Sequence, residues 1–531
     1  MLLLAVILPG SLKREIKNII RSLKRKKLSI KLRRRGLMDM RKWVNGLLSK
    51  RRVLSEPVKA SVWYMICNVL NKGIALLSTP IFTRLLTEEQ YGKFAIFQSW
   101  YSIILIFTSL NIFMGGYTKG LLLYRDDKER LTSSLLSLTT LITCCFGIVY
   151  LINIDFWTDV FELSPMLMSA MFLELIVMPA VEFWAAKEKF DFKYKKYVLI
   201  SLLTTAFSLC GGILAVINTS HKLEARIFSD ILGKAIFAVV IFVMLLSRGK
   251  TFFNKEYWLY ALKFNIPLLP HYLSNYVLNQ SDRIMIGRMV GNDKAAFYSV
   301  AYTISTMMML IITAINNSLT PYLYKAIDDV EHGNETFEAM KKKVMSITHL
   351  LFVLVAGLCV ATMAFAPEII FVFAGEKYTE AIYVIPPIAA STFFIFTYVM
   401  FSTIEYYFQK TGRIALATTA CALLNLFLNY IFIRRYGYYA AGYTTLACYM
   451  ALSLMHYIFY KAIIRRKMPG INSVYDIKVI IMITVIVLGM MFIMIFTYKL
   501  LEVRYGIILI MTLLVVMKRK YLLQVFHAFK K

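Results

Sequence analysis

Apolar runs of about twenty residues recur along almost the whole chain, and they limit its fold more than any other feature. A helix of that length crosses the hydrocarbon layer of a bilayer, where backbone groups must be satisfied within the chain. The sequence therefore predicts an all-α polytopic membrane protein with about fourteen transmembrane helices. The predicted spans are residues 61–83, 94–117, 131–151, 165–184, 197–218, 226–247, 264–283, 294–318, 344–366, 381–402, 412–432, 440–460, 477–497 and 503–517.

Composition agrees with this class. Of the 531 residues, 59% are hydrophobic and 17% are charged, whereas soluble proteins carry about 45–50% and about 25%. The net charge of +30 lies between the apolar runs and at both ends of the chain, so it indicates a membrane surface and no nucleic-acid partner. The seven cysteines fall inside apolar runs without a Cys-x-x-Cys pair, and the histidines lack ligand spacing. We therefore expect no disulfide, no metal and no cofactor.

Lysine and arginine concentrate in alternate connections, which places both termini in the cytoplasm. Before the first span, Lys24–Lys27 and Arg33–Arg35 allow two interpretations. They form a basic helix on an anionic membrane surface, or translation begins at Met38 or Met40 and residues 1–37 are dispensable. The second interpretation is favoured.

An internal repeat relates the two halves of the chain. The segment 84–94 resembles 288–298, pairing Arg84 with Arg288, Glu89 with Asp293, Gly92 with Ala296, and Phe94 with Tyr298. Residues 204–206 and 418–420 are both Thr-Thr-Ala. Six spans per repeat is an even number, so the two halves enter the membrane in the same sense and enclose a cavity on the axis between them. The expected organisation is a basic segment 1–57, an N-lobe 58–248 (spans 1–6), a C-lobe 249–462 (spans 7–12), and spans 13–14 with a basic tail in 463–531.

Sequence motifs give no support to an enzyme. The chain has no Gly-rich phosphate loop, no His-Glu-x-x-His and no nucleophile elbow. It also lacks the long outer loop that a membrane-embedded polymerase or ligase needs. A purely structural scaffold is disfavoured because several charged residues fall near the middle of predicted spans.

Polar residues inside spans are costly and normally face a bundle interior or a wet cavity. In span 1, Asn68 and Lys72 share a helix face, and Lys72 falls near mid-depth. Lys72 is either a cavity cation for an anionic ligand or the partner of an acid on a neighbouring helix. In span 4, Glu174 either carries a proton during a transport cycle or pairs with Lys72 or with Lys234 of span 6. Pairing is favoured for Glu174.

Span 7 holds the densest polar stripe, formed by His271 or Tyr272, then Asn275, Asn279 and Asp282, with Arg283 following. Span 11 places Asn425 and Asn429 on one face. Such amides line a cavity for sugar hydroxyls, or they hold helices together through interhelical hydrogen bonds. Cavity lining is favoured for span 7, and the two interpretations are equal for span 11. Asp282 and Arg283 also fit a local ion pair.

These residues resemble a known family. Arg84-Leu-Leu-Thr-Glu-Glu-Gln-Tyr-Gly-Lys-Phe94 is similar to the first outer loop of polysaccharide repeat-unit flippases (Wzx-type), members of the multidrug/oligosaccharidyl-lipid/polysaccharide exporter superfamily. The stretches 262–287, 297–302 and 425–442 also fit the family, in the same order and spacing. The resemblance covers about residues 58–517, and the first 37 residues depart from it.

The resemblance implies two six-helix lobes plus a terminal helix pair. The implied function is to move an undecaprenyl-diphosphate-linked oligosaccharide from the inner to the outer leaflet by alternating access. Implied diphosphate or gate residues are Lys72, Arg84, Lys234, Lys263 and Arg283. Implied sugar-binding residues are Asn68, His271, Asn275, Asn279, Asn425 and Asn429, and Glu174 and Asp282 are candidates for ion coupling.

The expected partners are the lipid-linked oligosaccharide, the lipid bilayer, an H⁺ or Na⁺ counter-ion and a polysaccharide polymerase, and the protein is expected to be a monomer. Two related functions stay open. A peptidoglycan lipid-precursor flippase carries the same anionic headgroup. A multidrug cation antiporter of the superfamily needs acids in its cavity, and Lys72 argues against it.

Overall fold

The computed structural model describes residues 56–333, 335–468 and 472–517. Within these residues all regular structure is helical, and each predicted span coincides with helix. Eleven helices of this part are long and apolar enough to cross a membrane. The helical, multi-pass class is therefore confirmed. The basic segment 1–55, with both interpretations of its start, lies outside the described residues.

Fifteen of the described helices carry the fourteen predicted spans, because α14 and α15 together correspond to span 8. They are α4 (Glu56–Leu85), α5 (Glu88–Ser109), α7 (Lys128–Ile152), α9 (Pro165–Phe190), α10 (Tyr194–Ile217), α11 (Lys222–Gly249), α13 (Leu269–Met289), α14 (Asn292–Thr306), α15 (Met309–Glu331), α16 (Phe337–Ala364), α18 (Ile385–Tyr407), α19 (Thr411–Tyr436), α20 (Tyr439–Lys467) and α21 (Ile477–Thr497), followed by α22 (Leu501–Met517). Short helices connect them: α6 (Gly116–Leu123), α8 (Ile154–Phe161), α12 (Lys255–Asn265) and α17 (Ala366–Ala374).

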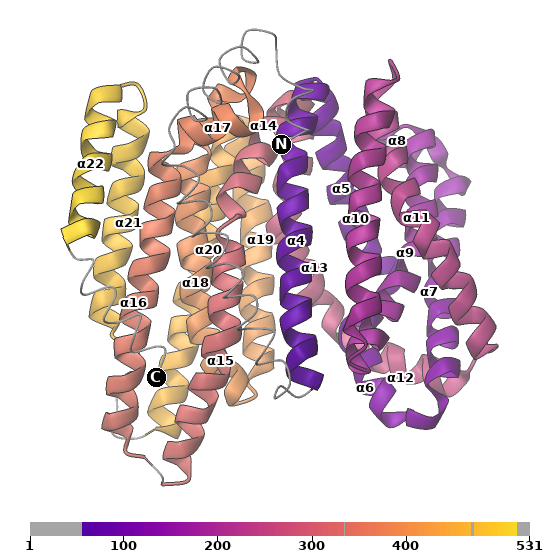
Figure 1. Ribbon diagram of the computed structural model, residues 1–531, viewed down its shortest axis with the longest axis horizontal. Helices are drawn as coiled ribbons and strands as arrows, with labels where there is room; N and C mark the ends of the chain where they lie inside the picture. Colours follow the sequence, from indigo (N-terminus) through magenta and orange to yellow (C-terminus); the bar gives the residue numbers. More distant parts are fainter. Residues whose placement is uncertain (1–55, 334, 469–471, 518–531) are drawn as a thin grey trace, which may run out of the picture.

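The helices form two groups with the same internal packing (Figure 1). In the N-bundle, defined as α4–α11, α10 packs against α4 and α11, and α9 packs against α11. In the C-bundle, defined as α13–α20, α19 packs against α13 and α20, and α18 packs against α20. The equivalence of these pairs is what a parallel repeat predicts. The terminal pair joins the C-bundle through contacts of α21 with α16 and α18.

Two predicted boundaries differ from the structure. Span 2 was expected to reach residue 117, but α5 ends at Ser109 because Leu110 and Asn111 adopt left-handed backbone conformations, with φ of 49° and 47°. The repeat-equivalent span 8 is also interrupted, at the turn 307–308 between α14 and α15. Beyond it, the charged connection expected near 319–343 is helical up to Glu331 in α15 and again from Phe337 in α16.

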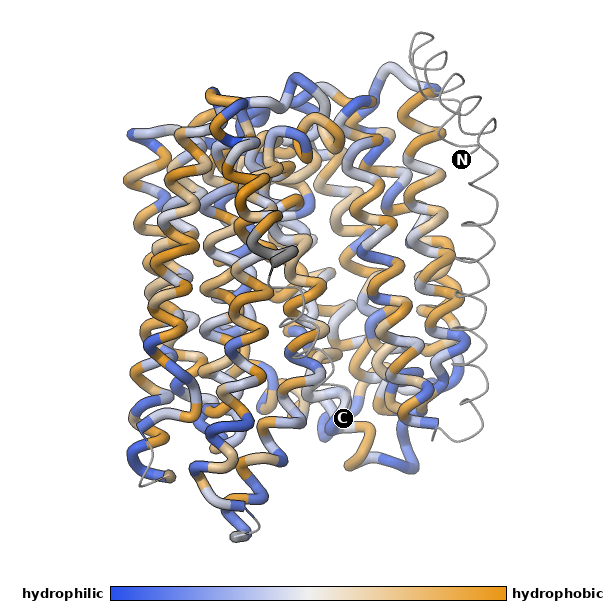
Figure 2. Tube along the Cα trace, turned by 60° about the vertical axis from the view of Figure 1, so that its left-hand side comes forward, coloured by the Kyte–Doolittle hydropathy of each residue, from blue (hydrophilic) through white to orange (hydrophobic). Residues whose placement is uncertain are grey.

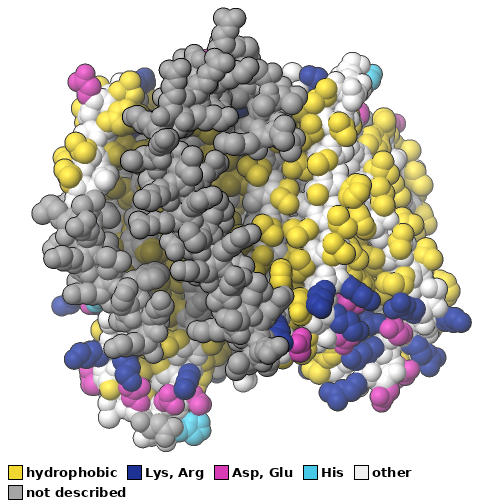
Figure 3. Space-filling model, in the orientation of Figure 1, with side chains coloured by type: hydrophobic (Ala, Val, Ile, Leu, Met, Phe, Trp, Pro, Cys, Tyr) yellow, Lys and Arg dark blue, Asp and Glu magenta, His cyan; other side chains and the backbone are white. Residues whose placement is uncertain are grey.

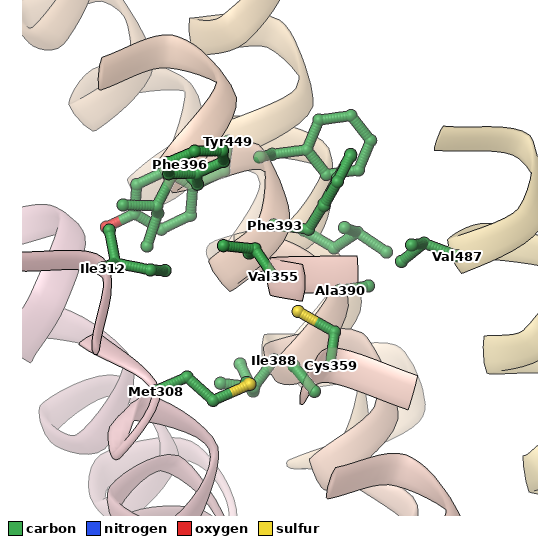
Figure 4. Close-up of a cluster of buried hydrophobic side chains, with 14 of the residues drawn as sticks. Met308, Ile312, Val355, Cys359, Ile388, Ala390, Phe393, Phe396, Tyr449 and Val487 are labelled. Carbon is green, nitrogen blue, oxygen red and sulfur yellow. The ribbon is translucent and has the colours of Figure 1, made fainter. Parts of the chain in front are cut away.

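The C-bundle core forms around α18, whose side chains are almost all buried. Figure 4 shows Phe393 and Phe396 of α18 among Ile312, Val355 and Cys359 of the neighbouring helices. Because apolar neighbours cover this helix on all sides, it lies away from lipid and gives the C-bundle a fixed centre.

Hydrophobic residues occupy the middle of the helices (Figure 2), and on the face shown in Figure 3 charged side chains gather mostly at one end. We call this the basic end; it holds α6, α12 and the α9–α10, α15–α16 and α18–α19 connections, with Arg125, Lys193, Lys263, Lys341 and Lys410. The other end, with α8, α17 and the α13–α14 turn, is the opposite end. At the basic end, α12 packs against α6 and α7 of the N-bundle, although residues 249–265 were expected to begin the C-lobe.

Candidate functional site

The two bundles meet through repeat-equivalent helices, because α5 packs on α14 as well as on α13. At the centre of this contact, Gly92 lies against the backbone of Asn292 and Ala296, and a Cβ on Gly92 would fall 1.7 Å from the Asn292 carbonyl oxygen. Gly92 and Ala296 are the pair that the sequence repeat aligns. The axis relating the two halves therefore passes between α5 and α14 near the opposite end.

Hydrogen bonds join the bundles on the same side. Ser99 Oγ of α5 donates to Gln280 Oε1 of α13 at 3.2 Å, and Thr83 Oγ1 of α4 donates to the Phe373 carbonyl at 3.2 Å. Arg84 donates to the Val372 carbonyl at 2.8 Å. These acceptors are the last carbonyls of α17, where a helix attracts cations. Arg84, one of the expected gate residues, therefore holds α4 against the C-bundle.

Lys72 lies halfway along α4. It is on the side of α4 that, further along the helix near the opposite end, contacts the C-bundle. Lys72, Thr79 and Thr83 are spaced by seven and four residues, so they share one side of the helix. The Lys72 side chain is exposed, and it forms no hydrogen bond or ion pair with the described part of the chain. Asn68, one turn earlier, is likewise exposed and without a partner among the described residues. The expected pairing of Lys72 with a neighbouring acid is therefore not found among these residues.

Lys234 of α11 is held between two acids. Its Nζ lies 2.8 Å from Glu174 Oε1 of α9 and 2.7 Å from Asp230 Oδ2. Arg226 lies 3.5 Å from Asp230, and the Arg226 guanidinium covers the Phe82 ring. Two acids and two bases thus balance in charge. In this conformation Glu174 has Lys234, and not Lys72, as its partner.

Asp282 of α13 is fully buried and surrounded by uncharged donors. Thr445 Oγ1 donates to it at 2.9 Å, Asn429 Nδ2 at 2.5 Å, and the Tyr298 hydroxyl also donates. Asn425 accepts from Ser281 at 3.3 Å and from Asn429 at 3.1 Å. Asn425 and Asn429 are themselves fully buried, so in this conformation they connect α19 to α13 and α20 and do not line a cavity.

Arg283 and Lys263, two further expected cation sites, differ in burial. Arg283 is buried between α13 and α14, donates to Gln280 Oε1 at 2.9 Å and lies 4.4 Å from the centre of the Tyr302 ring. Among the described residues no ion pair joins Arg283 to Asp282, the local pairing that the sequence allowed. Lys263 is exposed on α12 at the basic end.

The span 7 amides separate into two environments. Asn279 accepts hydrogen bonds from Tyr302 at 2.8 Å and Tyr449 at 3.2 Å, which makes it part of the packing between helices. His271 and Asn275 line a cavity of about 270 Å³ inside the C-bundle, bounded by α13, α15, α18 and α19. His271 Nδ1 lies 3.1 Å from Thr418 Oγ1, and its Nε2 lies 3.3 Å from Asn275 Nδ2.

Several residues of this cavity were absent from the sequence predictions. Thr320 and Tyr324 of α15 line it, together with Tyr398, Ser402 and Tyr406 of α18. A signal existed on α15, because Thr313, Asn317, Thr320 and Tyr324 recur at helical spacing. The predicted span ended at residue 318, which cut this stripe in two.

Two equivalent helix bundles closed against each other at one end define a polytopic membrane protein of the two-lobed transporter class. On the facing side, halfway along α4, lies a lysine that has no partner within residues 56–333, 335–468 and 472–517. The chain belongs to the family described as "Polysaccharide biosynthesis protein", which matches residues 58–327. The family "MatE" matches residues 267–431.

Among similar proteins, two carry names from glycan assembly. A protein of the Lsg locus of Haemophilus influenzae is 24% identical over 51% of this chain, and the chain covers 66% of that protein, just under two thirds of its length. A "Probable low-salt glycan biosynthesis flippase" of Haloferax volcanii is 21% identical, over 75% of this chain and 82% of its own length. The "Lipopolysaccharide biosynthesis protein WzxC" of Escherichia coli is 21% identical, over 62% of this chain and 65% of its own.

Solved structures share the fold. A multidrug resistance MATE family transporter of the MOP superfamily in an inward-facing conformation has a TM-score of 0.59 at 13% identity, covering 75% of this chain and 96% of its own. The lipid II flippase MurJ in an inward closed conformation has a TM-score of 0.59 at 15% identity, covering 87% and 99%. At these identities the likeness concerns the fold alone.

Proposed function

We propose that this protein moves undecaprenyl-diphosphate-linked polysaccharide repeat units from the inner to the outer leaflet of a bacterial plasma membrane by alternating access. The observation that carries the proposal is Lys72, an exposed cation at mid-depth with no counter-charge among the described residues. A charge in this position is costly unless an anion joins it, and a diphosphate supplies that anion. The names of the family and of two relatives belong to glycan assembly, and the relative from Haloferax volcanii is named as a flippase, which supports the proposal.

The positive-inside rule sets the orientation. The basic end faces the cytoplasm, both termini lie there, and the closed opposite end faces outward. The conformation described here then receives its substrate from the cytoplasmic side. Lys263 on α12 is the first cation that an incoming diphosphate meets, followed by Lys72, with Arg283 at the closed end. Arg84 acts as part of the outer gate, because its hydrogen bonds hold α4 to α17.

Each part of the substrate occupies the environment that suits its chemistry. The diphosphate stays near Lys72, where the low dielectric strengthens its attraction to the lysine. The sugars occupy polar regions that include Asn68, His271 and Asn275, and the polyprenyl tail remains in lipid. The lobes that move are the N-bundle and the C-bundle, close to the predicted units 58–248 and 249–462 except that α12 stays with the N-bundle, and 463–531 adds the terminal pair. The protein acts as a monomer and passes its product to a polysaccharide polymerase.

A proton or sodium ion bound at Asp282 couples transport to an ion gradient. The support is that Asp282 is buried among neutral donors, whereas Glu174 is already matched by Lys234. A buried carboxylate that forms no ion pair favours protonation or the binding of a cation.

Replacing Lys72 tests the proposal directly. In a host whose own copy is deleted, Lys72→Ala should lower surface polysaccharide by about tenfold or more, because the diphosphate loses its counter-charge. Lys72→Arg should retain activity. Lys59→Ala is the matched control, since Lys59 lies on the same helix but pairs with Glu56 at the basic end. Immunoblots of the membrane fraction establish that each variant is present. Normal polymer levels in Lys72→Ala would remove this residue from the site.

A flippase for a peptidoglycan lipid precursor is the second candidate, because Lys72 suits any polyprenyl diphosphate. Complementation separates the two: restored surface polysaccharide supports the first function, and rescue of cells depleted of their lipid II flippase supports the second. The uncompensated cation at Lys72 disfavours a multidrug cation antiporter.

A further inference from the structure

The cavity inside the C-bundle differs in chemistry from the cation sites. Its lining contains no Asp, Glu, Lys or Arg from the described part of the chain. Three tyrosines come from two helices, Tyr324 from α15 and Tyr398 and Tyr406 from α18, and His271 and Asn275 come from α13. His271 is two residues from the start of α13, and Tyr406 is one from the end of α18, so the cavity lies in the half near the basic end.

The lining combines ring faces with unused hydrogen-bonding groups. The hydroxyls of Tyr324, Tyr398 and Tyr406 form no hydrogen bond with the described residues. A tyrosine offers an apolar ring and a polar tip, and a hydroxyl both donates and accepts. A sugar ring needs this combination, because its C–H face is apolar and its edge carries hydroxyl groups. Idle hydroxyls beside a cavity in a membrane protein are therefore better explained by a polar ligand than by packing.

We propose that this cavity binds one uncharged sugar ring of the lipid-linked repeat unit while the diphosphate lies at Lys72. The inference rests on the proposed function and names the class of sugar that this part of the site accepts. The volume of about 270 Å³ is just below the ~300–1,000 Å³ of pockets that hold drug-sized ligands. It therefore takes a single ring and not an entire repeat unit.

The surroundings favour a neutral sugar. Glu405, which precedes the lining residue Tyr406 on α18, is already paired: His456 Nδ1 lies 2.7 Å from Glu405 Oε1, with both side chains fully buried. The His456 ring stacks on Tyr398 at 5.5 Å, which separates this pair from the cavity. A uronic acid would bring a carboxylate into a lining that holds no Lys or Arg, where neutral donors alone offset only part of its desolvation cost.

Binding measurements on the purified full-length protein in nanodiscs test the inference. The probes are undecaprenyl diphosphate alone and the same lipid carrying one N-acetylglucosamine, one galactose or one glucuronic acid. We expect at least one neutral sugar to tighten binding by about tenfold or more over the diphosphate alone, and glucuronic acid to give no gain. An equal gain with glucuronic acid, or no gain with either neutral sugar, would overturn the inference.

Substitutions in the cavity show whether the tighter binding caused by the sugar arises there. Tyr324→Ala and Tyr406→Ala should each remove most of the tightening caused by the sugar and leave the affinity for undecaprenyl diphosphate unchanged. Tyr322→Ala is the matched control, since Tyr322 lies on α15 beside Tyr324 but does not line the cavity. If both variants keep the full gain, the sugar binds elsewhere and the inference fails while the proposed function stands. If the wild-type protein binds none of the four lipids, the proposed function itself fails.

Discussion

Asp282 and Glu174 are both buried carboxylates, but the charges around them differ. Glu174 shares Lys234 with Asp230, in a group whose charges balance. Asp282 accepts hydrogen bonds from Tyr298, Asn429 and Thr445, none of which carries a charge. Removing one partner of a buried ion pair costs about 3–5 kcal/mol of folding stability, whereas a carboxylate among neutral donors is free to exchange a bound proton or cation. The first arrangement suits structure and the second suits ion coupling.

Asp282→Asn should therefore abolish the stimulation of transport by a sodium or proton gradient in proteoliposomes, with a loss of about tenfold or more in the gradient-driven rate. Glu174→Gln is the matched comparison. We expect it to lower the thermal stability of the purified protein, because Lys234 loses one of its two acids, and to leave the pH profile of transport unchanged. A pH profile flattened by Glu174→Gln would instead assign the coupling proton to Glu174.

Sequence reasoning at the residue scale found charges and amides that stand out in apolar runs, such as Lys72, Glu174 and Asp282. It missed Ser402 and Tyr406, because Ser and Tyr do not stand out in a membrane helix. It missed Tyr324 because the predicted span ended at residue 318, before that residue. Ser402, for example, donates to the Val399 carbonyl of its own helix. Which amides face a cavity and which join helices depends on the neighbouring helix, and the spacing of Asn275 and Asn279 alone does not contain that information.

At the scale of elements, the contact between α5 and α14 depends on the lack of a side chain at Gly92. Helix backbones approach this closely only at small residues. Apolar length predicted the spans well, because helix and bilayer thickness are directly related. The interruption at 307–308 was missed because it contains neither Gly nor Pro. The interruption after Ser109 did carry a signal that the prediction passed over, because Asn111 and Gly115 lie between α5 and α6.

Gly92→Ala should weaken the closed contact, because the new Cβ would meet the Asn292 carbonyl oxygen. Overpacking of this kind costs about 1–3 kcal/mol, enough to shift a two-state equilibrium by about tenfold. The measurement is labelling of Ser99→Cys by a membrane-impermeant thiol reagent from outside, in a background without native cysteines. Gly73→Ala is the control, since a Cβ there meets nothing within 4 Å. Equal labelling of both variants would show that this contact does not close the outer side.

For the whole molecule, every hydrogen bond and ion pair between the N-bundle and the C-bundle in the described ranges lies in the half near the opposite end. The bundles are thus joined on one side only. Transport by alternating access requires that these bonds break and that others form near the basic end. The two-lobed plan was predictable from the repeat, whereas the side on which the lobes touch required the three-dimensional structure.

Joining the bundles covalently tests this movement. With cysteines at Ser99 and Gln280, whose side chains are 3.2 Å apart, a short cleavable bifunctional thiol reagent should stop transport, and cleavage should restore it. The control pair is Asn71 and Thr205, which lie 3.0 Å apart within the N-bundle. Cross-linking that pair should leave transport intact. Continued transport with Ser99 and Gln280 joined would mean that the bundles need not separate here.

The hydrogen bonds between Arg84 and the end of α17 depend on the side chain of only one partner, the arginine. The acceptors are main-chain oxygens, which every amino acid supplies equally, so exchanging the residues at 372 and 373 leaves the acceptors in place. Only the donor on α4 can be altered by a point mutation. If Arg84 belongs to the outer gate, as proposed above, selection for a looser or tighter gate acts on position 84. Suppressor mutations that rescue a transporter locked in one conformation should then accumulate there and spare the facing turn.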